Sequence, residues 1–139
     1  MDTCIFCKII ANEIPSYTVY EDEHTRAFLD IFGVTDGHTM VVHKRHEKTI
    51  IGYTEKEVAD VFITVKKVTT AIEKAFSTKI LSIGINHGEP KGVSHMHVHI
   101  MPRFDGDGGG IIQSLPNKKL VEKDFGKILS KEKRNQNQE

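Results

Sequence analysis

Three histidines alternate with apolar residues in the segment 95–101, which reads His-Met-His-Val-His-Ile-Met. Successive side chains of an extended strand point to opposite faces, so His95, His97 and His99 are predicted to share one face. The pKa of a free imidazole lies near neutrality, and this side chain can therefore act as a nucleophile, transfer a proton or bind a metal ion. Because three buried imidazoles would each need hydrogen-bond partners, the pattern favours a functional site over a structural role.

A second reactive pair lies near the N-terminus, where Cys4 and Cys7 form a C-x-x-C motif. In a reducing compartment such a pair serves metal or redox chemistry more often than it forms a structural disulfide. Zinc is bound by four Cys and His ligands in a closed tetrahedron, and this motif would supply two of them. A nucleic-acid-binding zinc finger is not expected, since 35 residues separate Cys7 from the next ligand pair, His43-x-x-His46.

Length and charge limit the class of protein that carries these groups. The chain has 139 residues, which predicts one domain. Lys and Arg together number 19, as do Asp and Glu, so no overall field favours nucleic acid or an anionic membrane. The sequence contains neither an apolar run long enough for a membrane span nor an N-terminal secretory signal. We therefore expect a cytoplasmic protein that binds neither nucleic acid nor membranes.

Strands and one long helix are predicted to position the reactive side chains. Thr54 and Glu57 have the spacing of a capping box, and apolar residues then recur every three or four positions, which predicts a helix over 54–77. Shorter helices are predicted over 4–11 and, in the polar tail, over 117–131. The β-rich segments indicate an α+β fold with a mostly antiparallel sheet, with strands over 17–21, 25–31, 38–43, 80–86 and 95–101.

The histidine segment, followed by Pro102 and Arg103, closely resembles the signature of the histidine triad superfamily. The resemblance extends over about residues 4–104 and is strongest to the bacterial Hint-like branch. It implies an α+β domain of about five strands per subunit, a core at 4–104, a C-terminal extension at 105–139 and a homodimer. The other blocks that resemble the superfamily are Cys4–Ile10, Val19–Asp22, Ala27–Ile31, Gly37–Val42, Lys44–His46 and Asn86–Gly88.

The resemblance implies a nucleotide hydrolase or transferase. In the family the middle histidine, here His97, attacks the α-phosphate of a nucleotide ester, anhydride or phosphoramidate, and water then hydrolyses the covalent nucleotidyl-histidine. His99 shares its face of the strand and could donate a proton or hydrogen bond as charge develops. His38 matches the family's fourth histidine, which helps to order the triad.

The nucleotide-binding residues also follow from the resemblance. Asp30 matches the acidic residue that accepts hydrogen bonds from both ribose hydroxyls, a task that suits a carboxylate. An apolar slot that holds the base mainly by burial implies a preference for purines. The positions that match the base slot are Phe6, Ile9, Leu29 and Ile31, and those near the phosphate are Asn86, Gly92, Val93 and Ser94.

The approach to the triad departs from the family pattern. The usual segment is Gly-Gln and three further residues before the first histidine, whereas Gly92-Val93-Ser94-His95 is two residues shorter and lacks the glutamine. Ser94 could replace the polar group that assists the leaving atom. Without the glutamine we expect less efficient hydrolysis of dinucleoside polyphosphates.

The resemblance also completes the possible zinc site. Some Hint-like proteins add a histidine from the Lys-x-His block and the first histidine of the triad to the two cysteines, and here these are His46 and His95. The site would be structural, and it would fix the strand beside His97.

Two other functions remain as alternatives. Three histidines can hold a catalytic metal ion, which would make the protein a metal-dependent hydrolase. A nucleotide-binding adaptor with little turnover would use the same binding residues, so the sequence alone does not exclude it.

Overall fold

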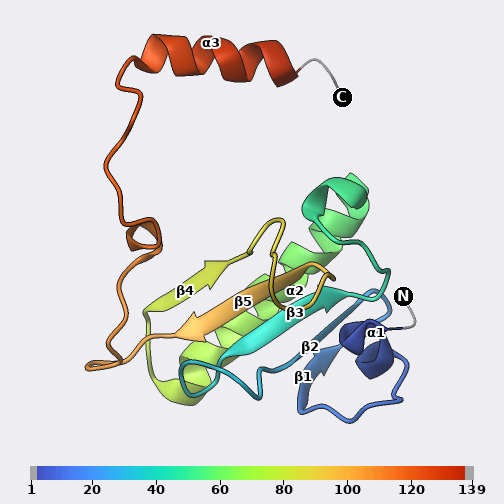
Figure 1. The fold of residues 1–139 in the computed structure, drawn as a ribbon. Helices are drawn as coiled ribbons and strands as arrows, with labels where there is room; N and C mark the ends of the chain where they lie inside the picture. The colour runs from blue at the N-terminus through green and yellow to red at the C-terminus, as the bar shows by residue number, and fades with distance from the viewer. Residues whose placement is uncertain (1–2, 137–139) are drawn as a thin grey trace. The chain divides into compact units, whose positions relative to one another are not determined.

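Five antiparallel strands form the frame that carries the histidine segment, which confirms the predicted α+β fold (Figure 1). The computed structural model describes residues 3–136. The strands follow the order β1-β2-β3-β5-β4, so β5 lies inside the sheet, between β3 and β4. Their bounds are Thr18–Glu21 (β1), Thr25–Leu29 (β2), Thr39–His43 (β3), Leu81–Gly84 (β4) and His97–Pro102 (β5).

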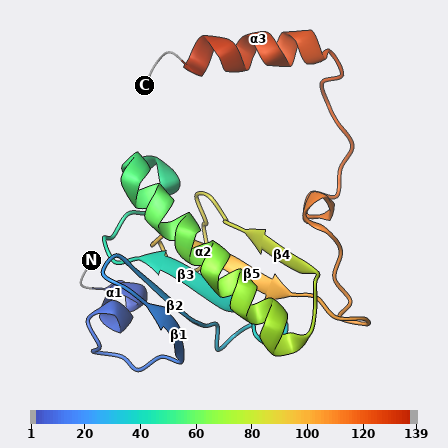
Figure 2. The same ribbon diagram turned by 180° about the vertical axis from the view of Figure 1, so that it is seen from behind.

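The long helix α2, Glu55–Phe76, lies across one face of this sheet, behind it in Figure 1 and in front of it in Figure 2. The predicted capping box is confirmed: the backbone N–H of Glu57 donates to Oγ1 of Thr54 at 3.2 Å, and the N–H of Thr54 donates to Oε1 of Glu57 at 2.9 Å. A short 3₁₀ turn, η1 (Ile50–Gly52), precedes it. The helix is followed by its C-cap residue, Ser77, whose φ of 52° is left-handed.

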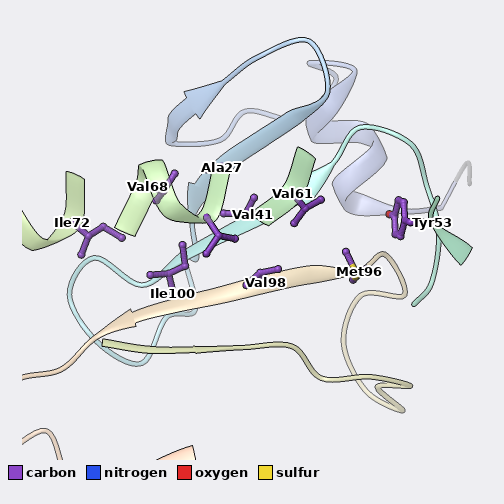
Figure 3. Close-up of a cluster of buried hydrophobic side chains, with 10 residues drawn as sticks. Ala27, Val41, Tyr53, Val61, Val68, Ile72, Met96, Val98 and Ile100 are labelled. Carbon is purple, nitrogen blue, oxygen red and sulfur yellow. The ribbon is translucent and has the colours of Figure 1, made fainter. Parts of the chain in front are cut away.

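The main core lies between α2 and the sheet (Figure 3). From the helix it contains Val61, Val65, Val68 and Ile72, and each is at most 6% exposed. Burial of a side chain of this size contributes about 1.5–3 kcal/mol. The residues that face them are Ala27, Val41, Val98 and Ile100 of the sheet and Met96 of the segment before β5. Because strand residues alternate, the packing of Val98 and Ile100 against α2 turns His97 and His99 to the opposite face.

A smaller core covers that opposite face. Helix α1, Ile5–Ile10, buries Phe6 and Ile9 against residues of β2 and β3, among them Phe28. Cys4 caps this helix, since its Sγ accepts a hydrogen bond from the N–H of Cys7 at 3.4 Å. The cap places both cysteines beside the sheet face that carries the histidines.

The chain divides into two compact units: the first ends at Gly109 and the second begins at Gly110. Within residues 110–136 it contains the 3₁₀ turn η2, Ile112–Ser114, and the helix α3, Phe125–Gln136. The prediction of a helix over 117–131 had the wrong bounds, because Asp124 begins it: its carboxylate accepts a hydrogen bond from the N–H of Lys127 at 3.1 Å. No helix in the described part of the chain is long and apolar enough to cross a lipid bilayer.

Candidate active site and metal site

The prediction that all three histidines of the triad lie on one strand is wrong. Strand β5 begins at His97, and His95 precedes it in a bend where its side chain is fully buried. His97 and His99 pair with Val42 and Met40 of β3 and face away from α2. Among the described residues, the ligand atoms of His95 lie with the two cysteines, whereas His99 lies with His38 and Asp30. The three histidines therefore do not converge on one metal ion.

His97 is held by a hydrogen bond to the backbone two residues earlier. Its Nδ1 lies 2.7 Å from the carbonyl oxygen of His95, which can only accept, so Nδ1 carries the proton. In the neutral ring Nε2 then has a free lone pair. The ring is 7% exposed and meets the ring of Phe6 edge-on at 5.0 Å between centroids. The geometry thus fixes both the tautomer and the orientation of a potential nucleophile.

A chain of hydrogen bonds sets the tautomer of His99. The N–H of Val34 donates to Nδ1 of His38 at 3.1 Å, so Nε2 of a neutral His38 carries the hydrogen. This Nε2 lies 2.8 Å from Nδ1 of His99, which must accept and leaves its proton on Nε2. Burial, followed by the neighbouring His97 and His38, lowers the pKa of His99 to about 4. His99 is therefore a neutral group with an N–H to donate at pH 7.

Asp30 lies beside His38, next to this series of hydrogen bonds. It follows β2, and its Oδ2 lies 3.7 Å from Nε2 of His38, while Oδ1 accepts the N–H of Phe32 at 2.9 Å. Burial lowers the pKa of His38, and Asp30 partly opposes that shift. The carboxylate of Asp30 is thus a neighbour of the histidine pair, at a position from which it could accept hydrogen bonds from a ligand.

The predicted base-slot residues are only partly brought together. Phe6 and Ile9 are buried on the triad side, and Ile31 is 71% exposed beyond the end of β2. Leu29 points to the opposite face of the sheet, where it lines an apolar cavity beside α2. Phe28 was missed by the sequence reasoning, although it shares the face of Asp30 by strand alternation and meets Phe6 at 5.4 Å between ring centroids.

A cavity of about 260 Å³ lies beside His97. Among the predicted phosphate-contacting residues, Asn86, Val93 and Ser94 line it, whereas Gly92 lines a neighbouring cavity of about 450 Å³ that also reaches Cys4 and His46. The sequence reasoning missed two charged residues of the smaller cavity, Lys48 and Glu89. The shortened loop before the triad was the only sequence signal that this wall would differ from the family pattern.

The four predicted zinc ligands form one cluster, with ligand atoms within 4.8 Å of one another. Nδ1 of His95 lies 3.6 Å from Sγ of both Cys4 and Cys7, and 3.2 Å from Nδ1 of His46. Sγ of Cys7 lies 3.3 Å from Nδ1 of His46. A tetrahedron with Zn–S of about 2.3 Å and Zn–N of about 2.05 Å has S···N edges of about 3.6 Å and an N···N edge of about 3.3 Å. The observed separations fit this geometry.

The protonation of the cluster also suits a cation. Nε2 of His95 donates to the carbonyl oxygen of His43 at 2.8 Å, which leaves Nδ1 without a proton and directed at the cluster. Burial, followed by the nearby Cys4 thiol, raises the pKa of Cys7 to about 11, and burial lowers the pKa of His95 to about 4. Without an ion both groups are thus neutral, and a bound cation would offset the cost of forming thiolates.

The family model that describes the HIT domain matches residues 11–106 of this chain, which include the sheet, α2 and the triad. The chain belongs to the HIT family. This HIT protein is 46% identical over 114 residues to the Bacillus subtilis protein hit, covering 80% of this chain and 79% of the relative.

Solved structures of other HIT proteins share its fold. A Bacillus subtilis family member superposes with a TM-score of 0.83 at 40% identity, with 96% of each chain covered. A histidine triad nucleotide-binding protein from Candida albicans gives 0.79 at 29% identity, covering 95% of this HIT chain and 96% of the other. A zinc-bound histidine triad family protein from Mycobacterium smegmatis gives 0.71 at 27% identity, covering 92% and 90%.

Proposed function

We propose that this HIT protein is a nucleotide hydrolase or transferase that acts on the α-phosphate of purine nucleotide conjugates through a covalent nucleotidyl-His97 intermediate. The observation that carries this proposal is the hydrogen bond from Nδ1 of His97 to the carbonyl oxygen of His95, which directs an unprotonated Nε2 toward the cavity. A neutral, oriented imidazole is a competent nucleophile at pH 7.

The reaction would proceed in two displacements. In the first, a bond forms between Nε2 of His97 and the α-phosphorus while the bond to the leaving atom breaks, and a leaving nitrogen takes up one proton from solvent as it departs. In the second, a water oxygen bonds to phosphorus while the bond to Nε2 breaks, and the water releases one proton to solvent. The N–H of His99 would stabilise charge on the phosphoryl oxygens in both steps, with Ser94 as a further donor at the cavity wall. His38 would hold His99 in the donating tautomer.

The nucleoside would lie on the α1 side of the sheet. Asp30 supplies the acceptor for the ribose hydroxyls, and Phe6 with Phe28, Ile9 and Ile31 supplies the apolar surface for a base. Such a slot binds a flat ring by burial and stacking, so we expect a preference for purines with weak discrimination between them. Asn86, Gly92 and Val93 would approach the phosphate from the loop.

We further propose that Cys4, Cys7, His46 and His95 hold a structural zinc ion. The fit of the four ligand atoms to a tetrahedron supports this, as does the zinc-bound Mycobacterium smegmatis relative. All four positions would be taken by protein, so the ion would supply no open site for substrate. It would tie α1 to the bend before β5 and thereby support the backbone carbonyl that orients His97.

Mass spectrometry tests the function directly. Mixing the protein with an adenosine 5′-phosphoramidate and quenching within milliseconds should reveal a transient adenylyl adduct on a peptide that contains His97. An adaptor without turnover would bind the nucleotide and form no adduct. A metal-dependent hydrolase would hydrolyse it without an adduct and would lose activity in a chelator. Either result would refute the covalent mechanism.

We also propose a homodimer, built on α2 and the strand after it. Strand β4 lies at an edge of the described sheet, and α2 exposes Phe62 and Ile63 to solvent. Light scattering at micromolar concentration should give about twice the mass of 15.7 kDa, and a monomer would contradict the proposal.

A further inference from the structure

The loop between β4 and β5 brings a carboxylate next to the proposed nucleophile. Oε2 of Glu89 lies 3.6 Å from Nε2 of His97. This oxygen is buried, and within residues 3–136 it accepts no hydrogen bond. An unpaired buried carboxylate oxygen is costly, so its retention in the cavity wall points to a donor that a ligand supplies.

The backbone of the same loop makes room for this side chain. Gly92 has a φ of 109°, a conformation that favours glycine, and a Cβ at this position would lie 2.9 Å from Oε1 of Glu89. A larger residue would therefore displace the carboxylate. The loop conformation and the absence of a side chain at Gly92 together keep Glu89 beside His97.

No fixed cation neutralises the carboxylate. Among the described residues, the only basic side chain within 4.0 Å of the Glu89 carboxylate is His97, and the ring nitrogen that faces Glu89 is the unprotonated Nε2. Lys48 lines the same cavity, but it is exposed and forms no such pair with Glu89. Any leaving group in this cavity would thus meet the negative charge of Glu89. Repulsion between two like charges about 6 Å apart lowers a binding constant by about tenfold at an effective dielectric constant of about 40.

We propose that Glu89 is a specificity-determining residue, whose carboxylate favours a leaving group with an N–H or ammonium group and disfavours a polyphosphate. This inference rests on the proposed function, because it concerns the group that departs from the α-phosphate. The α-phosphate has the same charge in both kinds of substrate, so its repulsion from Glu89 cancels in the comparison. An amine leaving group can donate to the open oxygen, whereas a polyphosphate adds negative charge and no donor at neutral pH. In this role Glu89 would act through its charge, and no bond to its side chain forms or breaks.

The test compares kcat/KM for two substrates of the full-length protein. One is the adenosine 5′-phosphoramidate of 1,2-diaminoethane, which carries an ammonium group, and the other is diadenosine tetraphosphate. Glu89→Gln keeps the size of the side chain and removes its charge, and it should shift the ratio of the two kcat/KM values at least about tenfold toward the tetraphosphate. Glu89→Asp retains the charge and should shift the ratio less.

Two further variants separate local charge from net charge. Lys48→Gln removes a cation from the same cavity and should shift the ratio in the opposite direction. Glu23→Gln makes the same charge change as Glu89→Gln at a side chain that is 87% exposed, and it should leave the ratio within about twofold.

A ratio within twofold of wild type in folded Glu89→Gln would overturn the proposal, as would an equal shift in Glu89→Asp. Wild-type protein that hydrolyses neither substrate would refute the proposed function itself, and the role of Glu89 with it. If Glu89→Gln does not fold, the wild-type ratio at about 0.05 M and about 0.5 M NaCl provides the test. Salt should weaken the preference for the phosphoramidate several-fold, and an unchanged ratio would overturn the proposal.

Discussion

His97 has a structural contact and a proposed chemical role on different ring atoms, and two substitutions should separate them. Its Nδ1–H donates to the carbonyl oxygen of His95 at 2.7 Å, while Nε2 is the proposed nucleophile. His97→Ala removes both groups. His97→Asn keeps an amide N–H near the position of Nδ1 but offers no unprotonated ring nitrogen. Both variants should lose turnover, and only the alanine variant should lose the full stability of the contact.

The structure sets the size of the stability effect. In His97→Ala the buried carbonyl of His95 loses its donor, which costs about 1–3 kcal/mol. The edge-on contact with Phe6, at 5.0 Å between ring centroids, contributes about 0.5–1.5 kcal/mol more. The sum of about 1.5–4.5 kcal/mol corresponds to a decrease in Tm of about 6–18 °C, at about 4 °C per kcal/mol. The decrease in Tm of the His97→Asn variant should be no more than about half of that in His97→Ala.

Activity and binding complete the test. We expect kcat to fall at least about 10³-fold in both variants, because the covalent route is lost. The Kd for AMP should stay within about tenfold, or 1.4 kcal/mol, since few ground-state contacts are removed. Calorimetry, single-turnover kinetics and detection of the adenylyl adduct measure the three effects. A folded His97→Asn variant that keeps a tenth of the wild-type kcat, or that still forms an adduct, would refute the assignment of the nucleophile.

Three further predictions concern the neighbouring groups. Asp30→Ala should weaken binding of ribonucleotides more than that of 2′-deoxyribonucleotides in titration calorimetry, since only the former offer both hydroxyls; equal losses would remove Asp30 from the ribose site. Removal of zinc, or the double substitution Cys4→Ser and Cys7→Ser, should lower Tm and reduce kcat only in part, without rescue by magnesium. Reduced protein that contains less than about a tenth of an equivalent of zinc by elemental analysis and binds none on titration would contradict the metal site. The lowered pKa of His99, about 4 against 6.5 in the unfolded chain, means that the unfolded state binds more protons between these values, so stability should fall as pH decreases from 6.5 to 4. His99→Gln should flatten this part of the Tm profile without abolishing the slope, because His38 titrates in the same direction, and an unchanged slope would refute the contribution of His99.

Local sequence patterns determined the frame of this protein. The period-two alternation after Met96 placed His97 and His99 on one face, because apolar neighbours must pack against a hydrophobic layer. The spacing of Thr54 and Glu57 determined where α2 begins, since a capping box needs only residues that are close in the chain. The same local rule failed in the tail, where composition alone did not reveal that Asp124 begins α3.

Tertiary structure decided which atoms meet. The chain bends at His95, so this ring leaves the face of the strand and joins Cys4, Cys7 and His46. No local pattern encodes that bend, since it depends on contacts between segments far apart in the chain. The tautomers also depend on contacts between distant segments: the proton position on His99 follows from a hydrogen bond to His38, which lies just before β3.

Two side chains show the same division between local and tertiary information. The family resemblance places Leu29 in the base slot, but strand parity turns this side chain toward α2, and Phe28 lies on the triad side instead. Glu89 had no motif to mark it, because its effect depends on a loop conformation that brings its carboxylate to 3.6 Å from His97. The sequence determined which residue types were available and which neighbours shared a face. Only the fold decided which of them surround the reacting nitrogen, because that distance is set by packing between elements that are remote in the sequence.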